Sequence, residues 1–259
     1  MPFADLPHSR LHYTFTGPAS APALILSHSL GTTLSMWDAQ ASVFDKSFRV
    51  LRYDMRGHGK SSVPPPPYTV AGLAQDVLEL ADSLNLARFH FCGLSLGGMI
   101  GMTLALQTPD RLQRLVLCNT SPKIGAPEFW NTRIEAVRSK GMKEVAPAVI
   151  ARWFTPEFQA SSPDTVAATM SVLESLDPQG YIGGCTAVRD FDFRDNLAKI
   201  RTPTLAISGT HDPAATPADG RSLAEHIAGA RYVELPTSHL SCVQDPPRFN
   251  QEVLSFLTT

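Results

Sequence analysis

Residues 92–98 read Cys-Gly-Leu-Ser-Leu-Gly-Gly and contain the pattern G-x-S-x-G, with Ser95 at its centre. The aromatic and apolar run at 88–92 predicts a short buried strand before the serine, and the apolar run at 99–107 predicts a buried helix after it. A strand, a sharp turn and a helix are the setting in which this pattern forms a nucleophile elbow. The stretch therefore predicts an α/β fold that presents a reactive serine at one sheet edge.

The bend of such a turn accounts for the glycines of the pattern. A backbone this tightly bent holds Ser95 in a strained conformation with its hydroxyl exposed, and side chains at positions 93 and 97 would collide. The start of the helix also directs free N–H groups at whatever Ser95 attacks. The alternative interpretation is a small-residue junction without chemistry, so the rest of the chain has to decide between the two.

The composition is that of a globular protein with a sizeable core. The chain has 259 residues, of which 43% are hydrophobic and 18% charged. At roughly 150 residues per domain this length allows one or two domains. The net charge of −2 and the lack of a basic run exclude the footprint of a nucleic-acid-binding protein.

The cysteines and the N-terminus bear on location. The four cysteines are widely spaced and form no C-x-x-C pair: Cys92, Cys118, Cys185 and Cys242. Residues 1–6 lack the basic segment and the long apolar run of a signal peptide. No apolar stretch reaches the roughly 18 residues of a membrane helix. We expect a cytoplasmic protein with reduced thiols and no membrane association.

Strand and helix patterns alternate along most of the chain. An N-terminal hairpin is expected from residues 3–6 and 11–16. Apolar runs predict further strands at 23–27, 48–53, 115–118, 204–208 and 232–235. Helical spacing of apolar residues marks a helix at 69–85, one around Leu223 to Ile227 and a last one from Phe249 to Leu257. This alternation predicts a mainly parallel sheet flanked by helices.

The pattern changes between residues 121 and 188. Buried strand runs disappear there, and helix-forming stretches at 128–140, 143–154 and 163–176 are separated by prolines. We expect a helical cap inserted after the sixth strand. The predicted division is a first core part at 1–121, the cap at 122–188 and a second core part at 189–259.

A serine hydroxyl is a poor nucleophile unless a base and an orienting acid activate it. In hydrolases built on an elbow the order along the chain is serine, acid, histidine. Asp212 follows the strand at 204–208, and His239 follows the last strand at 232–235. Because the carboxyl ends of parallel strands meet at one edge of a sheet, both are expected near Ser95.

Other residues compete for these two roles. Asp54 precedes the serine, and Asp190 and Asp192 lie where the cap returns to the core, before a strand rather than after one. His58 also precedes the serine and is expected to pack a loop, and His28 to pack under the loop after the first parallel strand. No spacing of histidine and cysteine suggests a metal site, so no metal is expected.

Short motifs along the chain carry a family resemblance. They are Ser29-Leu30-Gly31-Thr32-Thr33 with Met36-Trp37-Asp38, Leu51-Arg52-Tyr53-Asp54 with Arg56-Gly57-His58-Gly59, Cys92-Gly93-Leu94-Ser95, Cys118-Asn119-Thr120, Arg152-Trp153-Phe154-Thr155-Pro156, and Gly180-Tyr181 with Arg189-Asp190. With these the chain resembles the α/β-hydrolases from end to end and, within them, the 3-oxoadipate enol-lactonases. The catalytic pieces are shared by many hydrolases, whereas the cap segments 152–156 and 180–192 favour the lactonases.

The resemblance implies hydrolysis of 3-oxoadipate enol-lactone in the catabolism of aromatic compounds, without a cofactor. It implies that Ser95 attacks the lactone carbonyl, that His239 accepts the serine proton and later activates water, and that Asp212 holds the imidazole. The backbone N–H groups of Leu30 and Leu96 would form the oxyanion hole. Leu96 stands where this family often has methionine, which changes little if only its N–H is used.

The implied partner is a small lactone that carries a free carboxylate, so a cation in the cap is expected. The candidate cations are Arg133, Arg138, Arg152 and Arg189. Arg133 is also a candidate substrate-binding residue, together with three aromatic residues that could line the pocket: Trp37, Trp130 and Trp153. Each tryptophan could instead be packing, and Trp37 in particular could anchor the following helix.

Two alternatives to the lactonase stay open. One is a general carboxylesterase or a cofactor-free haloperoxidase-type perhydrolase of the same fold, since the difference lies in the shape and charge of the cap. The other is a ligand receptor that kept the hydrolase fold without turnover. A dehalogenase is disfavoured because its elbow nucleophile would be aspartate. The sequence leaves the oligomeric state open.

Overall fold

The chain is described here by a computed structural model of residues 2–259, which contains one eight-stranded sheet. The strands are β1 (Phe3–Asp5), β2 (Arg10–Thr16), β3 (Ala23–Ser27), β4 (Arg49–Tyr53), β5 (Phe89–Leu94), β6 (Leu112–Cys118), β7 (Thr204–Gly209) and β8 (Arg231–Leu235). Their order across the sheet is β1-β2-β4-β3-β5-β6-β7-β8. Strand β2 is antiparallel to β1 and β4, and the remaining pairs are parallel. The prediction of a mainly parallel sheet with an N-terminal hairpin is confirmed.

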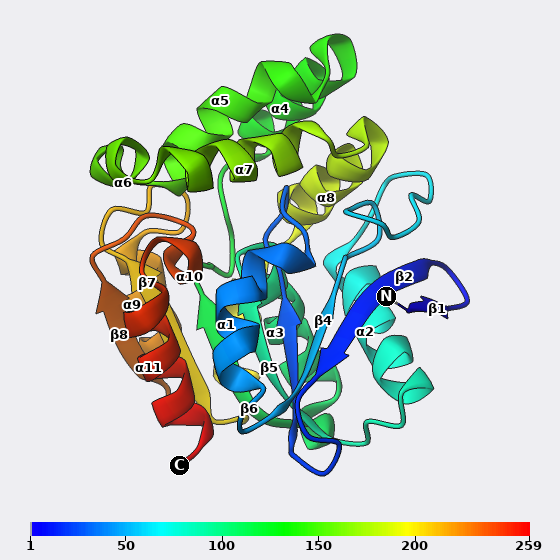
Figure 1. Ribbon diagram of the computed structural model, residues 1–259, viewed down its shortest axis with the longest axis vertical. Helices are drawn as coiled ribbons and strands as arrows, with labels where there is room; N and C mark the ends of the chain where they lie inside the picture. The colour runs from blue at the N-terminus through cyan, green and yellow to red at the C-terminus, as the bar shows by residue number, and fades with distance from the viewer. Residues whose placement is uncertain (1) are drawn as a thin grey trace.

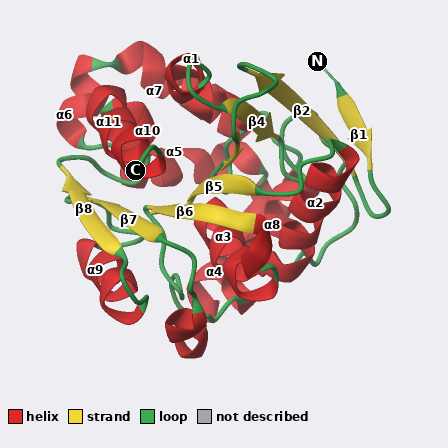
Figure 2. Cartoon of the chain, turned by 90° about the horizontal axis from the view of Figure 1, so that it is seen from below, coloured by secondary structure: helices red, strands yellow, loops and turns green. Residues whose placement is uncertain are grey.

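Helices cover both faces of this sheet (Figures 1 and 2). Helices α1 (Asp38–Phe44) and α11 (Pro246–Leu257) pack together on one face. Helices α2 (Val70–Ser83), α3 (Leu96–Gln107) and α9 (Pro217–His226) cover the other. Covering both faces explains why β3 and β5 are buried at every residue and apolar along most of their length. None of the helices in residues 2–259 is both long and apolar enough to cross a membrane.

Helix α3 lies in the centre of the molecule. Its residues from Leu96 to Ala105 are all buried, so it has no polar face of the kind seen on α11. Gly101 faces β5 and β6, and a methyl group there would meet Leu115 Cδ1 at 2.9 Å. The missing side chain therefore lets α3 approach the sheet closely, which fixes where its first residues lie relative to the strand ends.

A helical insertion follows β6. Its helices are α4 (Pro127–Lys140), α5 (Met142–Trp153), α6 (Pro156–Ser161), α7 (Pro163–Glu174) and α8 (Pro178–Asp190). They lie over the carboxyl ends of the parallel strands, shown in green to yellow in Figure 1. Within the insertion α4 packs on α8, and α5 packs on α7. The predicted helical insertion after the sixth strand is confirmed, and the three helices expected in it are present.

Helix α8 was not expected from the sequence, and the expected cap boundary at residue 188 falls within it. Three glycines, at positions 180, 183 and 184, disfavour an isolated helix. Tertiary packing requires them, because a methyl group on Gly183 would meet the Tyr68 ring at 2.5 Å, and one on Gly184 would meet Leu30 Cδ1 at 2.4 Å. The start of α8 is also capped, since the Asp177 side chain accepts hydrogen bonds from the backbone N–H groups of residues 179 and 180. Close contact with the core thus outweighs helix propensity here.

Candidate active site

The turn between β5 and α3 has the predicted strand-turn-helix geometry. Ser95 lies at φ 57° and ψ −113°, a strained conformation for a residue with a side chain. A methyl group on Gly93 would lie 2.1 Å from the Gly97 carbonyl oxygen, and one on Gly97 would lie 2.2 Å from the Ser27 carbonyl oxygen. The Ser95 N–H donates to the Cys118 carbonyl at 2.9 Å, which holds the strained residue against β6.

Asp212 and His239 meet at the same edge of the sheet. Asp212 follows β7 and His239 follows β8, and His239 Nδ1 lies 2.8 Å from Asp212 Oδ2. Both side chains are almost completely buried. Burial by itself raises the pKa of Asp212, but the charge of His239 and hydrogen bonds from His239 and from the backbone of Ala214 and Ala215 outweigh it, so the net pKa lies below its usual range. Asp212 is therefore held as a carboxylate.

Asn119, which the sequence analysis did not select, is part of the same cluster. It directly follows β6 and is fully buried. Its side-chain Nδ2 donates to Asp212 Oδ2 at 3.1 Å and to the Ser238 carbonyl at 3.1 Å. A polar residue immediately after a buried strand, next to the strand that carries the acid, is the pattern that could have indicated it.

Two backbone N–H groups next to Ser95 are free to bind an oxyanion. Within residues 2–259, neither the N–H of Leu30 nor that of Leu96 donates a hydrogen bond to another part of the chain. Leu96 is the first residue of α3, where an N–H has no helical partner. Leu30 lies in the loop after β3 and lines the same cavity as Ser95. Both positions expected for the oxyanion hole thus have an unused donor.

Two buried histidines hold the loop that carries Leu30. His58 Nε2 accepts the Gly31 N–H at 3.1 Å, and His28 Nε2 accepts the Met55 N–H at 3.0 Å. An acceptor nitrogen must be unprotonated, so each ring carries its proton on Nδ1. Burial lowers the pKa of both imidazoles. For His58, burial and the proximity of the His28 imidazole together lower the pKa to about 3. Both rings are therefore neutral, and they anchor the loop rather than take part in proton transfer.

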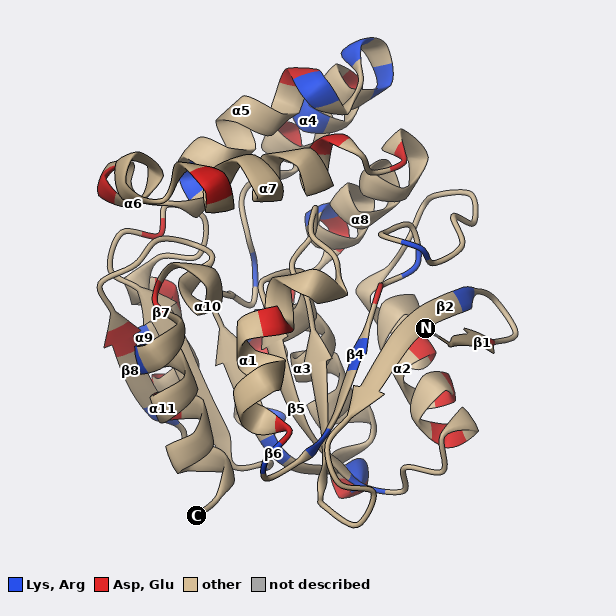
Figure 3. Ribbon diagram, in the orientation of Figure 1, with Lys and Arg blue, Asp and Glu red and all other residues tan. Residues whose placement is uncertain are grey.

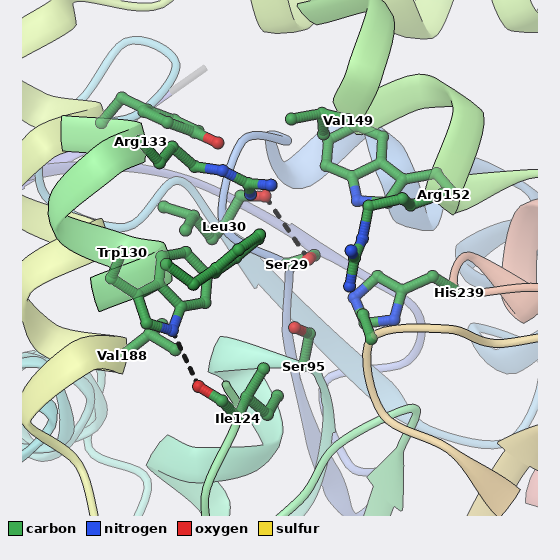
Figure 4. A pocket seen from close by; sticks show the side chains of 14 residues that line it. Ser29, Leu30, Ser95, Ile124, Trp130, Arg133, Val149, Arg152, Val188 and His239 are labelled. Atoms are coloured by element: carbon green, nitrogen blue, oxygen red, sulfur yellow. Dashed lines mark hydrogen bonds between the residues drawn. The ribbon is translucent and has the colours of Figure 1, made fainter. Parts of the chain in front are cut away.

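A cavity lies between the sheet edge and the insertion (Figure 4). From the core it is lined by Ser29, Leu30, Ser95, Ala214 and His239. From the insertion its lining includes Trp130, Arg133, Arg152, Trp153 and Tyr181. The space amounts to about 510 Å³, including its opening to solvent. The cavity is therefore bounded by the core on one side and by the insertion on the other.

Among the four candidate cations, two reach the cavity. Arg133 and Arg152 line it, and among the described residues neither forms an ion pair with a carboxylate. Arg138 instead pairs with Glu135 on the surface, and Arg189 pairs with Asp190. Figure 3 shows basic and acidic residues interspersed on α4, which carries Arg133 and Arg138. Which of the four arginines can reach a substrate thus depends on the face of the insertion that each one occupies.

The two arginines are electrostatically coupled. Burial and the nearby charge of Arg133 lower the pKa of Arg152, and together they outweigh the opposing effect of Asp212. Arg133 lies over the Phe129 and Trp130 rings, 4.6 and 5.2 Å from their centroids. In Figure 4, Arg152 extends toward His239, and Arg133 lies on the other side of the cavity, near Trp130. This arrangement favours an anionic group between them.

Two of the three candidate tryptophans line the cavity. Trp130 donates through Nε1 to the Ile124 carbonyl at 2.7 Å, which fixes its ring in the wall, and Trp153 also lines the cavity. Trp37 does not line it: its side chain is fully buried and its ring packs against Phe249. The expectation that Trp37 binds substrate is not supported, because the residue anchors α1 against α11.

The competing acids lie elsewhere. Asp54 is buried against His12, with 2.7 Å between Asp54 Oδ2 and His12 Nδ1, and accepts the Leu34 N–H. Asp190 and Asp192 lie near the surface and pair with the arginines at 189 and 194. Among the candidate acids, Asp212 alone contacts His239 in the part of the chain that the structure describes.

The chain is similar to known proteins in both sequence and structure. Residues 22–246 match the family model described as the alpha/beta hydrolase fold. The chain is 41% identical over 243 residues to 3-oxoadipate enol-lactonase 2 of Acinetobacter baylyi, which covers 94% of this chain and 91% of that protein. It superposes on the enol-lactonase from Burkholderia xenovorans LB400 with a TM-score of 0.98 and 47% identity over 100% of both chains. A malate-bound thermophilic esterase from Thermogutta terrifontis is 26% identical, with a TM-score of 0.94 over 100% of this chain and 98% of that one.

Proposed function

Because the chain belongs to the α/β-hydrolase family and, within it, to the enol-lactonases, we propose that it hydrolyses 3-oxoadipate enol-lactone to 3-oxoadipate. The observation that carries the proposal is the content of one cavity. It combines a serine on an elbow, a histidine bound to a buried carboxylate and two arginines that lack a carboxylate partner among the described residues. The first two groups suit acyl transfer, and the arginines suit a substrate with a free carboxylate.

The first step forms an acyl-enzyme. Ser95 Oγ attacks the lactone carbonyl carbon while His239 Nε2 accepts the hydroxyl proton. The bond between that carbon and the ring oxygen then breaks, and the ring oxygen leaves as an enolate that takes the proton from His239. Because the lactone is cyclic, this oxygen stays attached to the acyl chain. An enolate leaves more readily than an alkoxide, so the step needs no metal.

The second step releases the product. His239 accepts a proton from water, the resulting hydroxide attacks the ester carbon, and Ser95 Oγ leaves and regains its proton. The enol of the released chain tautomerises to the ketone of 3-oxoadipate. In both steps negative charge develops on the carbonyl oxygen, where the N–H groups of Leu30 and Leu96 are free to bind it. Each such donor typically stabilises the transition state by about 3 kcal/mol.

The arginines orient the substrate. The carboxylate of the lactone lies between Arg133 and Arg152, with the aromatic walls of Trp130 and Trp153 around the ring. Charge-assisted hydrogen bonds to a carboxylate are the strongest that these side chains can make. In the proposed binding mode the lactone carbonyl lies toward Ser95, which lines the same cavity as the two arginines.

The wider setting follows from the reaction. The enol-lactone arises in the breakdown of aromatic compounds, and we place the protein in that catabolism. We further propose a cytoplasmic location, which the four free, buried cysteines support. We propose that residues 1–121 and 189–259 form the catalytic core and that 122–188 form the cap over it.

The test is steady-state hydrolysis of 3-oxoadipate enol-lactone beside p-nitrophenyl acetate, for the wild type and Ser95→Ala. We expect kcat/KM for the lactone to exceed that for the simple ester by at least about 100-fold. We also expect Ser95→Ala to abolish both activities. Ser83→Ala, which removes a hydroxyl on α2 far from the cavity, is the control and should match the wild type.

Two other outcomes point elsewhere. Fast ester turnover with little lactone activity would keep Ser95 as the nucleophile and replace the lactonase by a general carboxylesterase. No turnover of either compound by the wild type would favour a ligand receptor.

A further inference from the structure

Asn119 occupies a central position at the catalytic edge of the sheet. It follows β6, which lies between the elbow strand β5 and strand β7. Asp212 follows β7. Its backbone N–H donates to the Ile207 carbonyl of β7 at 2.7 Å. The residue is fully buried and has a φ of 44°, in the left-handed region that side chains rarely adopt. The backbone therefore turns at this point and directs the side chain toward the neighbouring loops.

The Asn119 side chain uses each of its polar groups there. Its Nδ2 donates to Asp212 Oδ2 and to the Ser238 carbonyl, both at 3.1 Å, and its Oδ1 accepts a hydrogen bond from Ser241 Oγ. A carboxylate and a carbonyl only accept hydrogen bonds, so the amide nitrogen must face them and the amide oxygen must face the hydroxyl. One orientation of the amide thus satisfies all three partners.

These contacts complete the hydrogen bonding of Asp212. Its Oδ1 accepts the N–H groups of Ala214 and Ala215 at 2.8 and 3.1 Å. Its Oδ2 accepts from His239 Nδ1 and from Asn119. A carboxylate with four donors has one available orientation and favours the ionised form.

The same side chain holds the histidine loop on both sides of His239. Ser238 directly precedes the histidine and Ser241 lies two residues after it, and both bind the Asn119 amide. A shift of this loop would therefore break contacts to Asn119 as well as the contact of the imidazole with Asp212. The amide connects the acid and the base through one rigid group.

We propose that Asn119 is a positioning residue of the catalytic centre, which holds Asp212 and the loop of His239 in the arrangement that proton transfer requires. This inference rests on the proposed function, because it assigns a role within the Ser95–His239–Asp212 site. Asparagine suits the role for a physical reason. An aspartate in its place would put a second negative charge 3.1 Å from Asp212, and an apolar residue would leave the Ser238 carbonyl and the Ser241 hydroxyl without the amide and remove one of the four donors to Asp212.

The experiment compares Asn119→Asp, which keeps the shape of the side chain, with the wild type. We expect kcat for p-nitrophenyl acetate and for the lactone to fall about 10- to 100-fold, as for loss of a hydrogen bond to a charged group, while KM changes less than about 2-fold. The added negative charge favours protonated His239, so the acid limb of the kcat/KM profile should move to higher pH. Arg152 of α5 also faces this pair and is unchanged in every variant.

The matched control is Asn250→Asp. Asn250 is also buried, but its Oδ1 accepts a hydrogen bond from Gln40, between α11 and α1, and it binds neither Asp212 nor the residues beside His239. This variant reports the effect of a buried asparagine-to-aspartate change on stability alone. A loss of kcat in Asn250→Asp as large as that in Asn119→Asp, or an unchanged kcat and pH profile in Asn119→Asp, would overturn the proposal.

Two further measurements keep the outcome decisive. If Asn119→Asp does not fold, Ser241→Ala leaves Asn119 in place and removes one partner, and kcat should fall about 3- to 10-fold at constant KM; an unchanged kcat contradicts the role. The downfield proton resonance of the His239–Asp212 hydrogen bond should shift in Asn119→Asp and not in Asn250→Asp. This signal needs no substrate, so it tests the role of Asn119 even if neither the lactone nor the ester is turned over. Absence of turnover by the wild type would count against the proposed function and not against the role of Asn119.

Discussion

The two walls of the catalytic cavity differ in how completely their polar groups are paired. On the core wall, Asp212 has four hydrogen-bond donors, and the imidazoles of His28 and His58 each accept a backbone N–H. On the insertion wall, Arg133 and Arg152 have no carboxylate partner among residues 2–259. The polar side chains that hold Asp212 and the oxyanion loop are thus paired, and the N–H groups of Leu30 and Leu96 stay free for an oxyanion, whereas the insertion wall presents positive charge that its own described residues do not neutralise.

This difference separates two tasks. Groups that move protons must be held in one geometry, and saturated hydrogen bonding in a buried site does this. Groups that select a substrate must keep their bonding capacity free until the substrate arrives. A half-buried arginine without a carboxylate partner is costly to desolvate, even where it donates to a carbonyl as Arg152 does to that of Pro213, and an anionic ligand offsets that cost. We therefore expect changes in the core wall to lower kcat and changes in the insertion wall to raise KM.

The strongest test of the core wall is Asp212→Asn. An amide in place of the carboxylate would direct an N–H group at His239 Nδ1, which favours the wrong tautomer, so kcat should fall by about 10⁴-fold at nearly constant KM. Steady-state kinetics with the lactone measures this. Asp190→Asn, which changes a surface acid bound to Arg189, is the control and should retain full kcat. A similar loss in both variants would contradict the assignment of Asp212.

The insertion wall is tested by Arg133→Met and Arg152→Met, which keep much of the side-chain volume and remove the charge. Each should raise KM for the lactone about 10- to 100-fold, as for the loss of a charged hydrogen bond. KM for uncharged p-nitrophenyl acetate should stay within about 2-fold, because that ester has no carboxylate. Arg138→Met removes an arginine that pairs with Glu135 outside the cavity and should change neither value. Equal effects on both substrates would show that the two arginines do not bind the lactone through its carboxylate.

The smallest effect concerns pH and His58. In the folded protein the pKa of this imidazole is about 3, so it stays neutral above that pH. In the unfolded chain it takes up a proton near its ordinary pKa of 6.5. Below pH 6.5 the unfolded state therefore binds more protons, so stability falls as the pH falls from 6.5 toward 3. His58→Gln removes this pH-dependent contribution to stability. Between pH 7 and pH 5 the Tm of the variant should therefore fall less than the Tm of the wild type, with a difference on the order of 5 °C.

A second histidine provides the control for His58. Burial and the charges of Arg114 and Arg88 lower the pKa of His90 to about 4, and this residue packs against Phe48 away from the cavity. His90→Gln should flatten the same pH dependence without changing kcat. His58→Gln should in addition lower kcat by up to about 10-fold, because the Gly31 N–H loses its imidazole acceptor in the oxyanion loop. An unchanged kcat in His58→Gln would show that the loop does not depend on this contact.

The sequence was sufficient for features whose causes are local. Glycines at 93 and 97 predict the elbow because the bend leaves no room for side chains, and the structure has that turn: a side chain at 93 would collide with the Gly97 carbonyl, and one at 97 with the Ser27 carbonyl at the end of β3. Apolar runs predict the buried strands because a parallel sheet is covered on both faces. The placement of Asp212 and His239 after two strands predicts their proximity, since the carboxyl ends of parallel strands share an edge.

Helix α8 and Trp37 show where local patterns failed. The glycines of α8 argue against a helix unless the core surface that presses against them is known. Trp37 lies beside a motif of the oxyanion loop, yet its ring turns into the core toward Phe249, 212 positions later in the chain. Neither the close packing nor the direction of the ring is encoded in the neighbouring residues.

The sequence by itself determined the fold class, the elbow and the order of serine, acid and histidine, because these depend on backbone sterics and on the alternation of strands and helices. Only the tertiary structure decided which arginines face the cavity and that Asn119 joins the acid to the histidine loop. Asn119 and Asp212 are 93 positions apart, and Arg133 reaches the cavity while Arg138 of the same helix does not, because the packing of α4 turns only one of them toward it. Hydrogen bonds and ion pairs depend on which side chains the folded chain brings within reach, and one sequence without its structure does not specify those distances.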